Sequence, residues 1–192
     1  MNPILTNELK EETFIRLYFS PKGGNFHYAG IKRAYLDFNR TLPIKDKNTI
    51  KREEKREETI QFLIDKLKGF ISTMYNNQEL FDTAHKELCY ELKEQWDELT
   101  IGQAQKWINM TLKYWLLMGN TRIGSIDTNA MFFHIPIDSY VLKGMLEVKT
   151  ITWSKISNYE EYLELQKKHR EKNTGNPPII DEICFFNKTE RV

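Results

Sequence analysis

The sequence predicts an all-α fold, a single compact domain over residues 1–192 with about seven to eight helices. Apolar residues recur at steps of three and four along most of the chain, which is the spacing of one helix face. Ser, Thr, Asn or Asp stands just before several of these runs, where helix N-caps are expected. Segments that alternate polar and apolar residues, as strands do, are nearly absent.

The first half of the chain carries three clear helical patterns. The opening segment 11–18 fits a short helix or a strand, whereas 27–41 has helical apolar spacing and is stopped by Pro43. Residues 48–59, which contain the charged run KREEKREE at 51–58, predict a solvated helix start, and an apolar stripe of helical period follows it. Asn77 can cap the next helix.

The middle of the chain combines a marked helix with a long irregular segment. Thr100 and Gln103 fit a capping box, in which each side chain satisfies a free backbone N–H at the helix start. From 120 to 137, scattered Gly, Asn, Asp and Pro predict a long loop, and such loops in compact domains are often functional. Asp138 or Ser139 can cap the short helix that follows.

Three further signals mark helix ends. Gly119 suits the C-terminus of the helix that starts near residue 101. A second capping box runs from Ser157 to Glu160, and Pro178 suits the first position of the last helix.

Composition and charge exclude several classes of function. Lys and Arg total 28 and Asp and Glu 27, which gives a net charge of +1, so any electrostatic partner must meet a local patch. No window approaches the ~18 apolar residues of a membrane span, and the N-terminus lacks a signal-peptide pattern. Cys89 and Cys184 lie far apart in apolar helical segments, as buried free thiols do. We therefore expect a cytoplasmic protein without membrane contact.

Known cofactor and metal motifs are missing from the sequence. No GxxxxGK[ST], GxGxxG or GxSxG pattern occurs, and the four histidines are scattered without ligand spacing. The sequence therefore predicts no cofactor and no metal site.

Polar residues of chemical interest concentrate between 99 and 143. One face of the helix starting near 101 carries two ammonium groups and two amides, from Gln103, Lys106, Asn109 and Lys113. This face could hold a phosphate backbone or simply face water. Asp138 would stay ionised at a helix N-terminus, where it could also serve only as a cap. His134, four residues earlier, fits the border of the same pocket or a partly buried histidine.

The run PIDSYVL from Pro136 to Leu142 resembles the Pro-Val-Asp-x-x-Val pattern of the helix-hairpin-helix DNA glycosylase superfamily, in which that Asp is catalytic. The segment IGQAQK, which contains Gly102, is similar to the glycine turn of that family's hairpin. The resemblance implies a mainly helical fold and excision of damaged bases. It implies Asp138 as the carboxylate that stabilises an oxocarbenium-like sugar or orients a nucleophile, and Lys106 as the Schiff-base nucleophile.

The chain also departs from that family in two respects. The family hairpin reads Gly-x-Gly, whereas this chain has Gly102 alone, which puts phosphate clamping by the hairpin in doubt. The interval between Lys106 and Asp138 is longer than the family's, so the role of Lys106 is the weaker of the two assignments.

Two hypotheses follow. In the first, the protein binds DNA as a base-excision DNA glycosylase-like enzyme, with Asp138 and Lys106 as catalytic residues. Its substrate-binding residues would be Lys113, Gln103, Asn109, His134 and Tyr140. In the second, it is a non-catalytic helical interaction or accessory protein that docks a protein partner through the charged helix 51–58, which the near-zero net charge favours. An open cleft with basic groups around Asp138 supports the first, and a packed helix cap supports the second.

Overall fold

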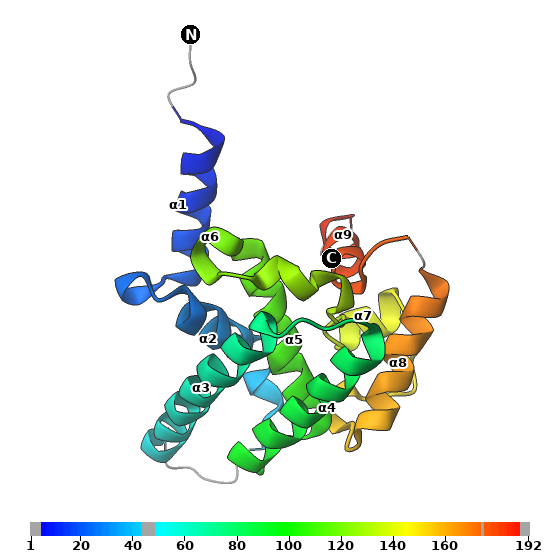
Figure 1. Ribbon diagram of the computed structural model, residues 1–192. Helices are drawn as coiled ribbons and strands as arrows, with labels where there is room; N and C mark the ends of the chain where they lie inside the picture. Colours follow the sequence, from blue (N-terminus) through cyan, green and yellow to red (C-terminus); the bar gives the residue numbers. More distant parts are fainter. Residues whose placement is uncertain (1–4, 44–48, 174, 189–192) are drawn as a thin grey trace.

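The computed structural model describes residues 5–43, 49–173 and 175–188. Helices make up most of these residues. Within these ranges there are nine α-helices and no strand, so the all-α prediction is confirmed (Figure 1). The α-helices are α1 (Asn7–Phe19), α2 (Phe26–Phe38), α3 (Thr49–Ser72), α4 (Gln78–Gln95), α5 (Ile101–Met118), α6 (Asn120–Ile123), α7 (Ser139–Gly144), α8 (Tyr159–Lys172) and α9 (Pro178–Lys188). The 3₁₀ helices are η1 (Lys22–Gly24), η2 (Asn39–Thr41), η3 (Ile126–Phe132) and η4 (Trp153–Lys155).

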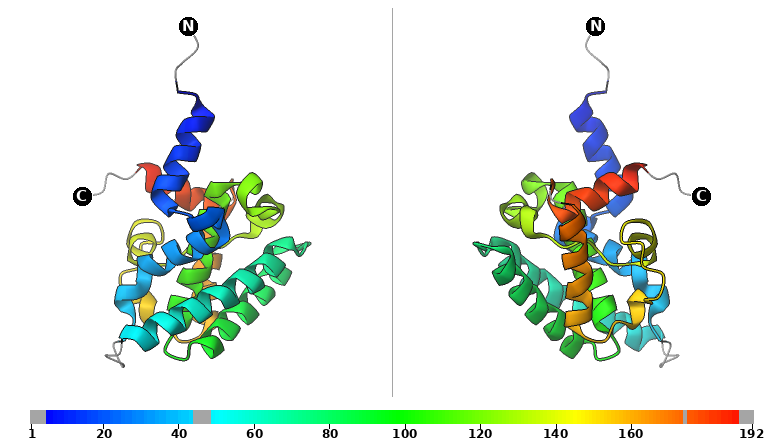
Figure 2. Two further views of the ribbon diagram at one scale, coloured as in Figure 1. Left: turned by 90° about the vertical axis from the view of Figure 1, so that its left-hand side faces the viewer. Right: turned by 90° about the vertical axis from the view of Figure 1, so that its right-hand side faces the viewer.

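Helix α5 runs through the centre of the fold, and α2, α4 and α8 pack against it (Figures 1 and 2). All of its residues from 101 to 115 are buried, polar ones included. On the α2 side, the indole N–H of Trp107 donates to the carbonyl oxygen of Ile31 at 3.0 Å. The indole N–H of Trp115 donates to the carbonyl oxygen of His27 at 3.2 Å. A helix buried on every side needs such partners for its polar groups.

Side-chain caps start several helices where the sequence places them. Asn77 accepts a backbone N–H of the first turn of α4 at 2.9 Å. Thr100 and Gln103 form the predicted capping box of α5. Asp138, and not Ser139, caps α7. These helix starts were predictable because a cap acts within three residues of its own position.

The helix predicted over 27–41 is α2, which ends at Phe38, followed by the 3₁₀ helix η2, which ends at Thr41. The other helix ends agree with the sequence except at one position. The ambiguous segment 11–18 lies within α1, Gly119 ends α5, and α9 begins at Pro178. Helix α8 is capped by Asn158, whose side chain accepts the N–H of the third helical residue at 2.8 Å. The capping box predicted to begin at Ser157 is therefore wrong by one residue.

The segment 120–137, predicted as a long loop, contains the short helices α6 and η3. Asn129 of η3 is buried, and its side-chain amide donates to the carbonyl oxygens of Ile71 (3.2 Å) and Thr73 (2.6 Å). The same side chain accepts the backbone N–H of Tyr75 at 3.3 Å. Asn129 thus ties the segment to the end of α3, a long-range contact that the local sequence does not reveal.

The charged start of α3 is exposed or half-buried as far as residue 58, and burial begins at Thr59. Residue 48, the first of the predicted solvated segment, lies outside the described residues. Cys89 is buried in α4, as expected, whereas Cys184 is exposed on the outer side of α9, which corrects the prediction of two buried thiols. No described helix combines the length and apolar character that crossing a membrane requires.

Candidate functional site

Lys106 of α5 and Asp138 at the start of α7 are in direct contact. The ammonium group of Lys106 donates to Asp138 Oδ2 at 2.6 Å. The other carboxylate oxygen, Oδ1, accepts the backbone N–H groups of Tyr140 (2.9 Å) and Val141 (2.8 Å) and thereby caps α7. The Lys106 side chain is 5% exposed and the Asp138 side chain 27%. The two predicted catalytic residues are therefore brought together, with both carboxylate oxygens already engaged.

Gly102, which carries the resemblance to a glycosylase hairpin, is covered by the segment around η4. Its backbone N–H donates to the carbonyl oxygen of Ile156 at 3.0 Å. A Cβ atom at this position would lie 1.8 Å from the carbonyl oxygen of Trp153, so only glycine fits. The N–H of Gly102 is thus used within the protein, where the family resemblance would have it face a phosphate.

The polar face of α5 is buried, although the sequence suggested that it meets either phosphate or water. Gln103 Nε2, for example, donates to the carbonyl oxygen of Thr41 at 2.8 Å. The correction applies to four predicted site residues, Gln103, Lys106, Asn109 and Lys113. Segments distant in the sequence cover this face and supply its hydrogen-bond partners, which is why helical periodicity alone could not place it.

Lys113, the predicted phosphate contact, is paired with a carboxylate of the chain itself. Its ammonium nitrogen lies 2.8 Å from Oε1 and 2.6 Å from Oε2 of Glu182 in α9, and both side chains are nearly fully buried. The same nitrogen lies 4.9 Å from the ring centre of Phe186, within cation–π range. The positive charge of Lys113 is therefore compensated by the Glu182 carboxylate in this structure.

His134 takes part in a buried hydrogen-bonded network between α4 and α8. Its Nε2 lies 2.7 Å from Asp82 Oδ1, and its Nδ1 lies 2.7 Å from the hydroxyl of Tyr162. The guanidinium of Arg170 donates to the same carboxylate, 3.0 Å from Oδ2. These partners assign the proton of His134 to Nε2, with the Tyr162 hydroxyl donating to Nδ1.

Asn109 connects this network to α5. Its amide nitrogen donates to the hydroxyl oxygen of Tyr162 at 2.8 Å. Its amide oxygen accepts from Nε2 of His85 at 2.9 Å, and Nδ1 of His85 lies 2.8 Å from the hydroxyl of Tyr159. The predicted substrate contact Asn109 therefore joins α4, α5 and α8 in the core.

Burial sets the protonation states of this network. It is the main cause that lowers the pKa of both His85 and His134, so both imidazoles are neutral at pH 7. Burial also disfavours the charged form of Asp82, but hydrogen bonds from His134, Gln78 and Arg170 outweigh it and lower the pKa of Asp82. The network holds one carboxylate against one guanidinium, which a buried charge requires.

Sequence reasoning found only two members of this network, His134 and Asn109. Tyr159, Tyr162 and His169 recur on one face of α8. Helical spacing predicts that the two tyrosines share a side of this helix, but it gave neither of them a polar role. The signal available in the sequence was a helical stripe whose residues all carry polar atoms, since such a stripe, once buried, needs hydrogen-bond partners. A carboxylate–imidazole–phenol series can relay protons when its end reaches a substrate. Here the phenol end, Tyr162, is fully buried, and its hydroxyl is shared between His134 and Asn109.

Tyr140, predicted to bind substrate, turns its ring toward α9. Its ring centre lies 5.0 Å from that of Phe185 and 6.4 Å from that of Phe186. Its hydroxyl is buried and has no hydrogen-bond partner among the described residues. The backbone of Tyr140 contributes to the cap at Asp138, whereas its side chain belongs to the contact with α9.

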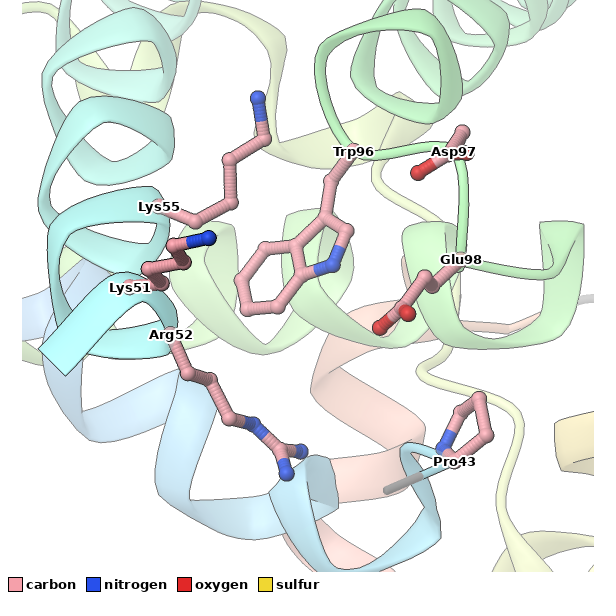
Figure 3. A pocket seen from close by; sticks show the side chains of 7 residues that line it. All are labelled: Pro43, Lys51, Arg52, Lys55, Trp96, Asp97 and Glu98. Carbon is pink, nitrogen blue, oxygen red and sulfur yellow. The ribbon is translucent and has the colours of Figure 1, made fainter. Parts of the chain in front are cut away.

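A pocket of about 230 Å³ lies between the start of α3 and the turn that follows α4 (Figure 3). The pocket is lined by Pro43, Lys51, Arg52, Lys55, Trp96, Asp97 and Glu98. The basic residues of the charged run form one wall, and the two acidic residues face them beside the indole of Trp96 (Figure 3). The predicted partner-binding helix 51–58 thus borders this pocket. None of the residues predicted for catalysis lines it.

Helix α1 extends away from the other helices (Figures 1 and 2). It also carries an exposed apolar surface. The most exposed of its large side chains are Phe14 (71%) and Leu17 (72%), and Tyr18 and Leu9 are also exposed. The opposite side of the helix is held by Ile15, which is buried. Neither a motif nor the helical spacing of 11–18 indicated this surface in the sequence.

Comparisons with protein-family models, curated proteins and solved structures return no match for this chain. Among the described residues, no group of three or more His, Cys, Asp or Glu side chains is placed to hold a metal ion.

Proposed function

We propose that this chain is a non-catalytic helical interaction protein and that α1 is its docking element. The observation that carries the proposal is the exposed apolar surface of α1, centred on Phe14 and Leu17. Apolar side chains gathered on one projecting helix are typical of protein-binding surfaces, because binding removes them from water.

The anchoring of α1 supports this role. Arg122 lies 3.1 Å from Glu11 and 2.7 Å from Glu12, and these ion pairs join α1 to α6. Tyr18 adds an edge contact with Tyr114 of α5, with ring centres 6.1 Å apart. A helix fixed along one side presents its other side in a defined orientation, which lowers the entropic cost of binding.

The surroundings of Asp138 favour this proposal over an enzyme. Asp138 caps a helix and pairs with Lys106, and the face that would bind a substrate is filled by the protein's own groups. The pocket beside Lys55 adds a local charged surface that a partner could use for orientation.

Site-specific photo-crosslinking tests the proposal. A photoreactive residue is placed at Leu17 in the full chain, and crosslinked products are collected from the cells that make the protein. The matched control carries the same residue at Leu80 of α4, which is 49% exposed. We expect a discrete protein product from position 17 that is absent from position 80. Identical products from both positions, or none from either, would overturn the proposal.

A second candidate function, binding of nucleic acid with glycosylase-like chemistry, is favoured by the 2.6 Å contact between Lys106 and Asp138. In such a reaction the Asp138 carboxylate would accept a proton from the Lys106 ammonium, which frees the amine to attack C1′ of the sugar. The bond between C1′ and the damaged base would break in the same step, and the base would leave after taking up a proton. Both groups would need to reach the flipped nucleotide, so the covering segments would have to move.

Borohydride trapping tests this second candidate. The protein is incubated with duplexes that carry damaged bases or an abasic site, and any Schiff base is reduced to a stable adduct. The candidate function predicts an adduct with the wild type that Lys106→Met abolishes and Asp138→Asn weakens. The control, Lys86→Met, changes an exposed lysine of α4 that pairs with Glu160. Absence of both excision and adduct in the wild type rules out this function.

A further inference from the structure

The contact between α9 and the rest of the protein places two adjacent carboxylates over basic groups. Glu182 pairs with Lys113 of α5, as described above. Asp181 Oδ2 lies 3.7 Å from Nε2 of His169 in α8. Helix α9 therefore sets two acidic side chains against one lysine of α5 and one imidazole of α8.

The same contact leaves polar groups without hydrogen bonds. Among the described residues, the buried side-chain atoms that lack a hydrogen-bond partner are the Tyr140 hydroxyl, both ring nitrogens of His169, Asp181 Oδ2 and Glu182 Oε2. Glu182 Oε2 still lies 2.6 Å from the ammonium of Lys113, so its charge is compensated. All of these atoms belong to α9 or to residues that it contacts, although buried polar groups are normally paired.

The apolar part of the contact is closely fitted. Phe185 packs against the ring of Tyr140 and over Gly144 of α7, where an added Cβ would lie 2.5 Å from the Phe185 ring. Helix α9 thus packs in one defined position. Its apolar side chains are closely packed there, whereas several buried polar groups of the contact lack hydrogen bonds. Close apolar packing together with unpaired polar groups is expected of a helix that docks reversibly. When such a helix detaches, the unpaired groups can bind water or a ligand.

We propose that α9 covers a phosphate-binding site formed by Lys113 and Tyr140, with the Glu182 carboxylate in the place of the phosphate. Displacement of α9 would leave the Lys113 ammonium without its counter-ion. Tyr140, whose ring lies beside the same Phe186 ring as Lys113, would gain access to the same opening. This proposal is independent of the docking role of α1.

The unfilled hydrogen-bond donor favours phosphate over a second carboxylate. Glu182 has two oxygens and both lie against Lys113, and the hydroxyl of Tyr140 stays unpaired. A phosphate group presents three acceptor oxygens and more negative charge, and could therefore pair with Lys113 and still accept from the Tyr140 hydroxyl.

Hydrogen exchange of the wild-type protein gives the first test. Amide exchange of α9, residues 178–188, is measured in inorganic phosphate and in sodium chloride at equal ionic strength. We expect phosphate to speed exchange in α9 and to leave the central helix α5 unchanged. Identical exchange in α9 under both conditions would overturn the proposal.

A charge-neutral variant gives the second test. In Asp181→Asn/Glu182→Gln the internal anion is lost, so the open state gains population and phosphate should bind at least about tenfold more tightly than to the wild type. The matched control, Glu53→Gln/Glu54→Gln, removes two adjacent exposed carboxylates from α3. Equal affinity in the two variants would contradict the proposal. If the charge-neutral variant does not fold, Phe185→Ala takes its place. This substitution weakens the packing of α9 against α7 without a change of charge.

The source of the phosphate is resolved with three probes, measured with the variant that opens α9. These are inorganic phosphate, an oligonucleotide with a 5′-phosphate and the same oligonucleotide without it. Binding of the first two alone identifies a terminal phosphate as the ligand, and equal binding of both oligonucleotides identifies the nucleic-acid backbone. Binding of none overturns the proposal. Lys113→Met in the same background should abolish binding of every probe.

Discussion

The ammonium of Lys106 and the carboxylate of Asp138 lie 2.6 Å apart, although 32 residues separate them in the chain. The contact joins the central helix to the cap of α7. The lysine side chain is almost fully buried, and the Asp138 carboxylate compensates its charge. The same pair that suggested catalysis in the sequence thus has a structural role that stability measurements can test.

Asp138→Ala should lower the free energy of unfolding by about 3–5 kcal/mol, because it leaves a buried ammonium unpaired and also removes a helix cap. Urea denaturation measures the loss. Adding Lys106→Met to Asp138→Ala should recover a large part of it, since no unpaired charge then remains. Simple additivity of the two single losses would argue against the ion pair as the cause.

Gly102→Ala should destabilise the protein by about 1–3 kcal/mol or more, because the new Cβ would collide with the carbonyl oxygen of Trp153. Gly69→Ala in α3 is the matched control, since nothing lies within 4 Å of its added Cβ. That substitution should stabilise the helix by up to about 1 kcal/mol. Thermal unfolding of both variants checks the contrast, and similar losses in the two would contradict the close packing of η4 on α5.

Two tyrosine-to-phenylalanine substitutions should change the free energy of unfolding by different amounts. Tyr162→Phe removes a hydroxyl that serves both His134 and Asn109, and should cost about 1–3 kcal/mol. Tyr140→Phe removes a buried hydroxyl without a partner and should be neutral or stabilising. Chemical denaturation of the two variants, which lose the same single atom, tests the network directly. A larger loss in Tyr140→Phe would refute the hydrogen-bond assignment.

The protein should lose stability as the pH falls below about 6.5. Burial lowers the pKa of His85 and His134 in the folded state. In the unfolded chain both residues take up protons near their ordinary pKa of 6.5, so acid favours unfolding. The expected slope is at most about 1.4 kcal/mol per pH unit for each histidine. Urea midpoints measured from neutral to mildly acidic pH check this, and a flat profile would contradict the burial of neutral imidazoles.

The helices and most of their caps were predictable because they depend on residues a few positions apart. The capping box of Thr100 and the cap at Asp138 are such cases. The burial of the α5 polar face was not predictable, because its partners come from segments far away in the chain. Glu182 neutralises Lys113 from 69 residues away, and periodicity around Lys113 carries no record of it. The exposed face of α1 was missed for the converse reason, since helical spacing predicts a covered stripe.

The effect of Phe14→Glu tests the central claim, that α1 is a docking element, most directly. The substitution is made in the chain that carries the photoreactive residue at Leu17, and both the crosslinked product and the free energy of unfolding are measured. Because Phe14 is exposed, the account predicts stability within about 0.5 kcal/mol of the parent together with loss of the product. An unchanged product with Glu at position 14 would contradict it.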